Sequence, residues 1–186
     1  MTTVFIAGSI SIKGLDAKVK HRIDNIIGQN HSILVGDADG VDTSIQSYLC
    51  DANANNAVVY CTGSVPRNNL GRWPVKSIEA GELKPGSRAF FTAKDVAMAE
   101  DADFGLMVWD SKSSGTLSNV IELLSRNKKS VVFVNKTKSF QNVGDVVQLE
   151  ELLTFMSPLA LQKVDMKIGL MRKLAQLKNE QIDMFI

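Results

Sequence analysis

A short polar turn in the second half of the chain carries the residue types that bind phosphate. An apolar run over 104–109 predicts a buried strand, and a helix is expected to open near Gly115. N–H groups at the start of a helix lack partners within the helix and attract anions, and glycine lets a ligand approach the backbone closely. The turn therefore predicts a phosphate cradle made of Ser113, Ser114, Gly115 and Thr116. The alternative is that Ser113 or Ser114 only caps the helix.

Two other turns hold the same place in the pattern, directly after an expected strand. The apolar run over 3–7 ends at Gly8 and Ser9, and the run over 32–35 leads into the segment 36–42. Ligands of open parallel sheets bind outside the carboxyl ends of the strands, where the strand order reverses, so the three turns are expected to line one crevice. Neither the dinucleotide fingerprint nor the P-loop pattern is present. The candidate ligand-binding residues of the 36–42 turn are Gly36, Asp37, Gly40 and Asp42.

The alternation of apolar runs and amphipathic stretches predicts an α/β protein. Strands are expected over 3–7, 32–35, 57–60, 104–109 and 130–134, and helices over 16–27, 41–51, 92–100 and from about 115. Short links between them indicate a Rossmann-like parallel sheet of about five strands flanked by helices. Helical spacing over 146–156 and 159–179 predicts a C-terminal helical extension. We divide the chain into a nucleotide-binding domain over 1–138, the extension over 139–180 and a terminal peptide over 181–186.

Composition and charge narrow the classes of protein. A chain of 186 residues with 45% hydrophobic and 22% charged residues is typical of one soluble globular domain with a tail. A net charge of +1 does not support extensive nucleic-acid binding, although it leaves room for a local basic patch. Without a leader or an apolar run of membrane-spanning length, we expect a cytoplasmic protein that uses no membrane.

Cysteine and histidine give no sign of a cofactor or metal. Cys50 and Cys61 lack metal-ligand spacing and are expected to be reduced thiols of the core. His21 and His31 are isolated, and we assign them neither catalysis nor metal binding. The sequence therefore predicts no cofactor and no metal.

A long irregular segment interrupts the alternating pattern over 62–89. Such segments inside compact domains are often functional, the alternative being a long surface loop without a function. Its Trp73 could stack on a nucleotide base. Basic residues in and just after the segment could close over phosphates as a lid, because a guanidinium fork suits that geometry. These residues are Arg67, Arg72, Arg88 and Lys94.

Several short motifs, taken together, resemble a known family. In chain order they are Ile6-Ala7-Gly8-Ser9, the segment 35–42, Lys94-Asp95 with Met98, Ala102-Asp103, and Ser114-Gly115-Thr116. As a set they resemble the SLOG superfamily of Rossmann-like proteins, which includes the DNA-processing protein DprA, the LOG phosphoribohydrolases and small YspA-like proteins. The resemblance is greatest to the YspA-like and DprA-like branches and covers about residues 3–135. It implies a crevice for a nucleotide-derived ligand or, in the DprA branch, a surface for single-stranded DNA.

The chain departs from the LOG enzymes at one position of the helix after the Ser-Gly-Thr turn. The resemblance places the LOG glutamate at Asn119, and an amide cannot act as the carboxylate of glycosidic cleavage. We assign Asn119 to ligand binding. Glu122 lies one helical turn deeper on the same face and is the candidate catalytic residue, the alternative being that it only pairs with a lysine. Asp37, Asp39 and Asp42 offer other carboxylates, although Asp42 is interpreted as a first-turn acid favoured by the helix dipole.

The last residues resemble the peptide with which bacterial replication and repair proteins bind the sliding clamp. The five residues are Gln181, Ile182, Asp183, Met184 and Phe185. Glutamine would bond at the rim of the clamp's pocket while the apolar side chains fill it. The alternative is that this apolar strip folds back on the core. The amphipathic helix before it is expected to pack on its own domain or on a second copy, as a homo-oligomer would.

Three functions follow from the sequence. The favoured one is binding or sensing of a nucleotide-derived, phosphate-bearing small molecule at the carboxyl edge of the sheet. The second is an N-glycosidase or phosphoribohydrolase acting on nucleoside monophosphates, which Asn119 disfavours. The third is a DprA-like, DNA-associated factor recruited to the sliding clamp, which the small net charge disfavours.

Overall fold

The computed structural model describes residues 1–79 and 81–183, with the backbone alone for residues 180–183. Its strands are β1 (Thr3–Gly8), β2 (Ser32–Gly36), β3 (Ala57–Thr62), β4 (Val75–Ile78), β5 (Phe104–Trp109), β6 (Lys129–Val134) and β7 (Ser139–Val143). Its helices are α1 (Ala17–Gly28), α2 (Val41–Asp51), α3 (Arg88–Asp101), α4 (Ser114–Ser125), α5 (Val146–Leu153), α6 (Pro158–Ile168) and α7 (Leu170–Asp183). The chain is thus an α/β protein with a Rossmann-like arrangement.

One seven-stranded sheet runs through the described residues in the order β4-β3-β2-β1-β5-β6-β7. All neighbouring strands are parallel except β6 and β7. The chain leaves β1 toward β2, β3 and β4, and then returns to place β5 on the other side of β1. The strand order therefore reverses between β1 and β5, which is where open α/β sheets bind ligands.

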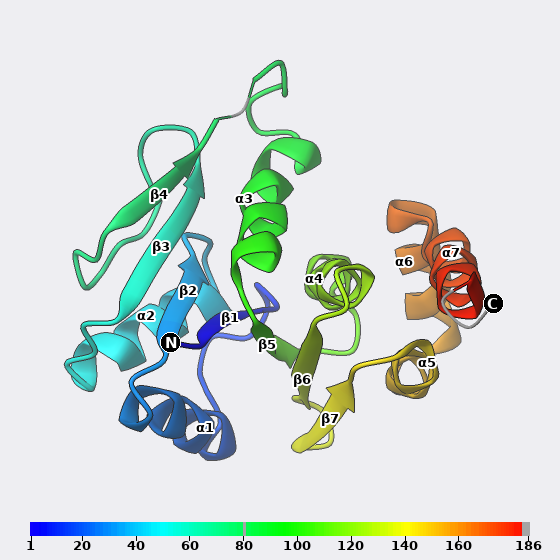
Figure 1. Cartoon of the computed structure of the whole chain (residues 1–186), viewed down its shortest axis with the longest axis horizontal. Coiled ribbons are helices and arrows are strands. Elements are labelled where there is room, and N and C mark those ends of the chain that lie inside the picture. Colours follow the sequence, from blue (N-terminus) through cyan, green and yellow to red (C-terminus); the bar gives the residue numbers. More distant parts are fainter. Residues whose placement is uncertain (80, 184–186) are drawn as a thin grey trace.

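Two hydrophobic clusters cover the two faces of the sheet. On one face, α1 and α2 pack Val19, Ile23 and Ile45 against side chains such as Ile6 and Val108. On the other face, α3 and α4 pack against the sheet, and the cluster continues into α5, α6 and α7. Figure 1 shows these last three helices gathered at one end of the molecule, beyond α4. The predicted helical extension therefore enlarges the cluster on the α3–α4 face.

The sheet has seven strands rather than the predicted five. The additional strands are β4, inside the segment predicted to be irregular, and β7, which follows the last predicted strand. Residues 75–77 of β4 are exposed and β7 reads Ser-Phe-Gln-Asn-Val, so neither strand carries the continuous apolar run of a buried parallel strand. Both lie at the edges of the sheet.

Two helix predictions also need correction. The helix predicted over 92–100 begins earlier, at Arg88, because Ser87 caps it by accepting from the N–H of Phe90. The single helix predicted over 159–179 is broken into α6 and α7 at Gly169, whose φ of 62° is left-handed. Among the described helices, we find no segment with the length and apolarity needed to cross a membrane.

Candidate functional site

The carboxyl ends of β1 and β5 are joined by side-chain hydroxyl groups. Ser9 follows β1, is fully buried, and lies with its Oγ 3.2 Å from Oγ1 of Thr116 in the first turn of α4. Thr116 donates its hydroxyl proton to Oγ of Ser113, 3.1 Å away, so Ser9 donates to Thr116. The N–H of Asp110 donates in turn to Oγ of Ser9 at 3.1 Å. The turn after β1 and the turn between β5 and α4 therefore lie side by side in the structure, as predicted.

Asp110 holds the β5–α4 turn in shape. One oxygen of its carboxylate accepts from the N–H groups of Lys112 and Ser113, and the other accepts from the hydroxyl of Ser11 at 2.6 Å. Partial burial alone would raise the pKa of Asp110, but these hydrogen bonds to its charged form outweigh burial and lower it. The next residue, Ser111, has a left-handed φ of 62° and a buried hydroxyl without a hydrogen-bond partner among the described residues. The turn is thus a constrained structure.

Of the first three N–H groups of α4, one is hydrogen-bonded within the protein and two have no acceptor among the described residues. Ser113 caps the helix, since its Oγ accepts from the N–H of Thr116. Within the described residues, the N–H groups of Ser114 and Gly115 have no hydrogen-bond acceptor. Space above Gly115 is open, because the nearest atom to an added Cβ there is Oγ of Ser113 at 3.9 Å. Two free donors thus point from a helix start at the reversal of strand order, a geometry that suits an anion.

The other predicted glycines are packed against protein atoms. A Cβ on Gly8 would lie 2.3 Å from the carbonyl oxygen of Val108 and 2.9 Å from Val41. At Gly40, whose φ is +82°, it would lie 2.4 Å from the carbonyl oxygen of Ile10. These glycines let neighbouring elements approach one another, and their contact with a ligand stays a prediction.

A buried ionic cluster lies beside Gly36. A Cβ there would meet the carboxylate of Asp42 at 2.4 Å and Nζ of Lys94 at 2.6 Å. Lys94 is 4% exposed, yet its Nζ lies 2.6 Å from the carboxylate of Asp95 and 4.0 Å from that of Asp42. Burial tends to lower the pKa of Lys94, but Asp95 and Asp42 outweigh it and raise it.

Asp42 has the most perturbed carboxyl of this cluster. Burial raises its pKa to about 7, against the opposing attraction of Lys94 and with a further contribution from Asp95. Its carboxylate also accepts from the N–H of Ala38 at 3.3 Å. Asp42 lies in the first turn of α2, as predicted, but its side chain is also buried in an ionic cluster that the sequence did not indicate.

Asp37 is bound by a residue of the predicted lid. Its buried carboxylate accepts from the backbone N–H of Arg67 at 3.0 Å and from the guanidinium at 2.7 Å and 3.1 Å. Burial would raise the pKa of Asp37, but the hydrogen bonds from Arg67 lower it. The guanidinium carbon also lies 4.8 Å from the ring centre of Phe91 in α3. Arg67 thus ties the segment to the sheet edge.

Trp73 is not placed as the lid hypothesis expected, and no side-chain contact among the described residues ties Arg72 to the site. Trp73 is 7% exposed, belongs to the core on the α1–α2 face, and donates its indole N–H to the carbonyl of Ala54 at 2.7 Å. It is therefore a core residue and is not free to stack on a base. Arg72 is exposed with a left-handed φ of 53°.

A cleft between α3, α4 and the α6–α7 joint brings three predicted residues together. It has a volume of about 220 Å³, and its walls include Arg88, Asn119 and Glu122. Asn119 is 7% exposed and its amide forms no hydrogen bond with the described residues, but its polar atoms are not fully buried and so face the open cleft. Glu122 is half-buried and pairs with Arg126 at 2.9 Å. Gly115 lies about one helical turn before Asn119 on α4, although neither it nor Ser114 is among the residues that line the cleft.

Sequence reasoning missed several residues of this cleft. Asp95 faces it from α3, while Lys167 and Lys173 come from α6 and α7. Asp95 directly follows Lys94 in the sequence and belongs to the Lys94-Asp95 motif, so it could have been included among the candidate site residues. The two lysines carried no such signal, because their approach to α4 depends on how the C-terminal helices dock on the sheet.

A larger hollow lies at the amino ends of β1, β5 and β6, opposite to the carboxyl ends of the strands. It measures about 600 Å³, and its walls include Arg22, His31, Phe104 and Lys129. None of the predicted site residues lines it. Parallel α/β sheets bind ligands at the carboxyl ends of their strands, so the smaller cleft beside α4 is the better candidate.

The predicted clamp-binding peptide is only partly described. The backbone of α7 continues through Gln181, Ile182 and Asp183. Met184 and Phe185 lie outside the described residues, as do the side chains of the preceding three. Clamp binding therefore stays a prediction.

Comparison with known proteins adds no relative. The sequence matches no protein-family model, and no curated protein is significantly similar to it. The resemblance to the SLOG superfamily accordingly stays an expectation drawn from the motifs.

Proposed function

We propose that this protein binds a nucleotide-derived, phosphate-bearing ligand in the cleft beside α4, as a SLOG-type binding or sensing protein. The observation that carries the proposal is the amide of Asn119. It lines the cleft and, although the residue is only 7% exposed, its amide forms no hydrogen bond with the described residues. Its polar atoms are not among the fully buried unpaired ones, so they reach the open space of the cleft and are available to a ligand.

The charges of the cleft suit a phosphate group. The free N–H groups of Ser114 and Gly115 belong to the first turn of α4, about one helical turn before Asn119, and Arg88 lines the wall of the cleft. Asp95 and Glu122 also line it, but each is already paired with a cation, at 2.6 Å and 2.9 Å. In this proposal the phosphate contacts the start of α4, and Asn119 bonds to the sugar or base. The free thiols of Cys50 and Cys61 agree with a cytoplasmic location.

Thermal-shift screening against nucleoside 5′-monophosphates tests this proposal. Binding raises the melting temperature in proportion to ligand excess. Gly115→Val fills the open space at the helix start, where the nearest other side chain is 3.9 Å from an added Cβ. We expect this variant to fold, by circular dichroism, and to lose the shift. No shift with any phosphate-bearing compound, or an unchanged shift in Gly115→Val, would contradict the proposal.

A second candidate function is N-glycosidic hydrolysis of nucleoside monophosphates. It is favoured by the position of Glu122, whose carboxylate lines the same cleft as Arg88 and Asn119. A carboxylate beside the sugar could stabilise an oxocarbenium ion or attack it. Release of free base that is lost in Glu122→Gln supports this candidate. Arg126→Gln is the matched control, because it removes the ion-pair partner of Glu122 while keeping the carboxylate.

A further inference from the structure

A second hollow adjoins the cleft beside α4, and its charges are all positive. It measures about 410 Å³ and is lined by α6 from Ser157 to Lys167 together with Lys112 of the β5–α4 turn. Lys167 lines both hollows, so they meet at this residue. The charged residues of the second hollow are three lysines, Lys112, Lys163 and Lys167.

Taken together, the walls of the two hollows carry five cationic side chains that form no ion pair with a carboxylate of the described residues. They are Arg88, Lys112, Lys163, Lys167 and Lys173, from four separate segments of the chain. The acids of the cleft are committed elsewhere, Asp95 to Lys94 and Glu122 to Arg126. One phosphate leaves most of this positive charge without a counterpart.

Two of these lysines lie on one face of α6. Lys163 and Lys167 are four residues apart, a spacing that places their side chains beside each other and makes like charges repel. Apolar residues, Leu159, Ala160 and Val164, line the same hollow. The three lysines of this hollow are exposed, so water screens each of them and an anion gains most by contacting several at once. An anion between Lys163 and Lys167 would also relieve their repulsion, which suits a second anionic group beside the one at the start of α4.

We infer that the ligand carries two or more phosphate groups, as a nucleoside polyphosphate or a dinucleotide does. One phosphate lies at the start of α4, and the others extend toward Lys163 and Lys167. The two hollows are small and walled by four helices and a turn, which suits a small molecule better than a long strand of nucleic acid. This inference rests on the proposed function and specifies its ligand.

Calorimetric titration with matched nucleoside 5′-mono-, di- and triphosphates tests the inference. The diphosphate is expected to bind about tenfold or more tightly than the monophosphate, because each added charged hydrogen bond contributes on that order. The double variant Lys163→Ala/Lys167→Ala is expected to bring the diphosphate affinity down to that of the monophosphate. Its monophosphate affinity should stay within about twofold, since the group at the start of α4 is untouched.

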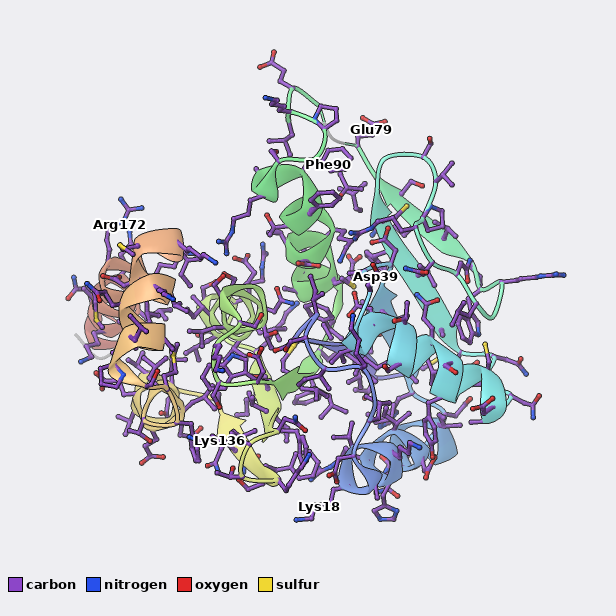
Figure 2. The ribbon with its side chains drawn as sticks, turned by 180° about the vertical axis from the view of Figure 1, so that it is seen from behind. Lys18, Asp39, Glu79, Phe90, Lys136 and Arg172 are labelled. Carbon is purple, nitrogen blue, oxygen red and sulfur yellow. The ribbon has the colours of Figure 1, made fainter. Side chains whose placement is uncertain are left out.

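Two variants serve as controls for charge. Arg172→Ala removes the neighbour of Lys173, and Lys136→Ala removes an exposed lysine in the β6–β7 turn; neither residue lines the two hollows. Figure 2 shows Arg172 on the outer side of the C-terminal helices and Lys136 near the β6–β7 turn. Both variants should keep the preference for diphosphate. Loss of that preference in either of them would mean that general charge, and not the hollow, causes it.

Each other result has a definite meaning. Equal affinity for mono- and diphosphate overturns this inference and leaves the proposed function standing. Failure of every nucleotide to bind overturns both. Tighter binding of a short single-stranded oligonucleotide than of any nucleotide, lost in the double lysine variant, would assign the lysines to nucleic acid and overturn the inference as well.

Discussion

The hydroxyl oxygens of Ser9 and Thr116 lie 3.2 Å apart, although 107 positions separate the two residues in the chain. The bond joins the end of β1 to the first turn of α4, across the point where strand order reverses. Because Asp110 donates its N–H to the same Ser9 oxygen, one buried side chain fixes both ends of the β5–α4 turn. The free N–H groups of Ser114 and Gly115 thus belong to a turn that is held in place before any ligand arrives.

Removing the Ser9 hydroxyl should loosen this turn. Ser9→Ala leaves the N–H of Asp110 without its acceptor and the hydroxyl of Thr116 without its donor. Stranded buried groups cost about 1–3 kcal/mol, so the free energy of unfolding should fall by that amount in urea titration. Ser125→Ala is the control, since this serine is exposed near the end of α4 and should change stability by about 0.5 kcal/mol or less. Equal effects of the two substitutions would contradict the role of Ser9.

Gly8 should prove a packing residue. A Cβ there would lie 2.3 Å from the carbonyl oxygen of Val108, a backbone atom of the paired strand β5. Gly8→Ala should therefore lower the free energy of unfolding by about 1–3 kcal/mol or more, as overpacking does. Gly28→Ala is the matched control, because nothing lies within 4 Å of its added Cβ. An unchanged stability in Gly8→Ala, with weakened ligand binding, would instead show that this glycine serves ligand approach alone.

Asp42 should make stability depend on pH in a direction unusual for an aspartate. Its pKa is raised from 3.8 to about 7, so the folded state binds a proton more tightly than the unfolded state does. The resulting stabilisation is complete below about pH 4 and is lost as pH rises toward about 7. Asp37 and Asp110, whose pKa values are lowered, act oppositely and only below about pH 4.

Asp42→Asn isolates this contribution. The melting temperature of the wild type should fall more steeply between pH 5 and about 7 than that of the variant. Asp39→Asn makes the same change at an exposed position of the same turn and should keep the wild-type slope. Identical slopes in the wild type and Asp42→Asn would rule out a raised pKa at Asp42.

Replacing Asn119 should remove ligand binding without lowering the stability of the unliganded protein. Replacing its amide by an apolar side chain of similar size in Asn119→Leu removes a polar group that has no partner among the described residues. The unliganded variant should be about as stable as the wild type, because the amide forms no hydrogen bond with the described residues for the substitution to remove. It should also lose the thermal shift given by phosphate-bearing ligands. A clear loss of stability without ligand would mean that the amide serves the fold.

Much of the fold could be predicted because its central strands are buried on both faces. The runs over 3–7 and 104–109 are continuous and apolar, and they correspond to β1 and β5. The edge strands β4 and β7 escaped prediction because exposed or polar residues alternate with few apolar ones. Strand pairing at an edge depends on the neighbour already present, which no local pattern reveals.

The site was predictable only where topology determines it. The reversal of strand order placed Ser9 beside Thr116, as the order of strands and helices predicted. Lys167 and Lys173 reach the cleft through the docking of α6 and α7, which the break at Gly169 makes possible. That docking is a tertiary event, and the sequence pattern indicated one continuous helix instead.

The backbone N–H of Ser114 offers the most direct test of anion binding at the start of α4. Ser114→Pro removes this one donor, and proline is well tolerated at the first position of a helix. The preceding residue, Ser113, already has the extended conformation that proline requires of it, with φ −65° and ψ 116°. Ser114→Ala is the control, because it removes the hydroxyl and keeps the N–H.

The deciding measurement is the calorimetric affinity of the two Ser114 variants for the phosphate-bearing ligand that stabilises the wild type most in the screen. Loss of a hydrogen bond to a charged group should weaken binding by Ser114→Pro about tenfold or more, while Ser114→Ala stays within about twofold. Unchanged affinity in Ser114→Pro, with its fold intact by circular dichroism, would contradict binding of an anion at the start of α4.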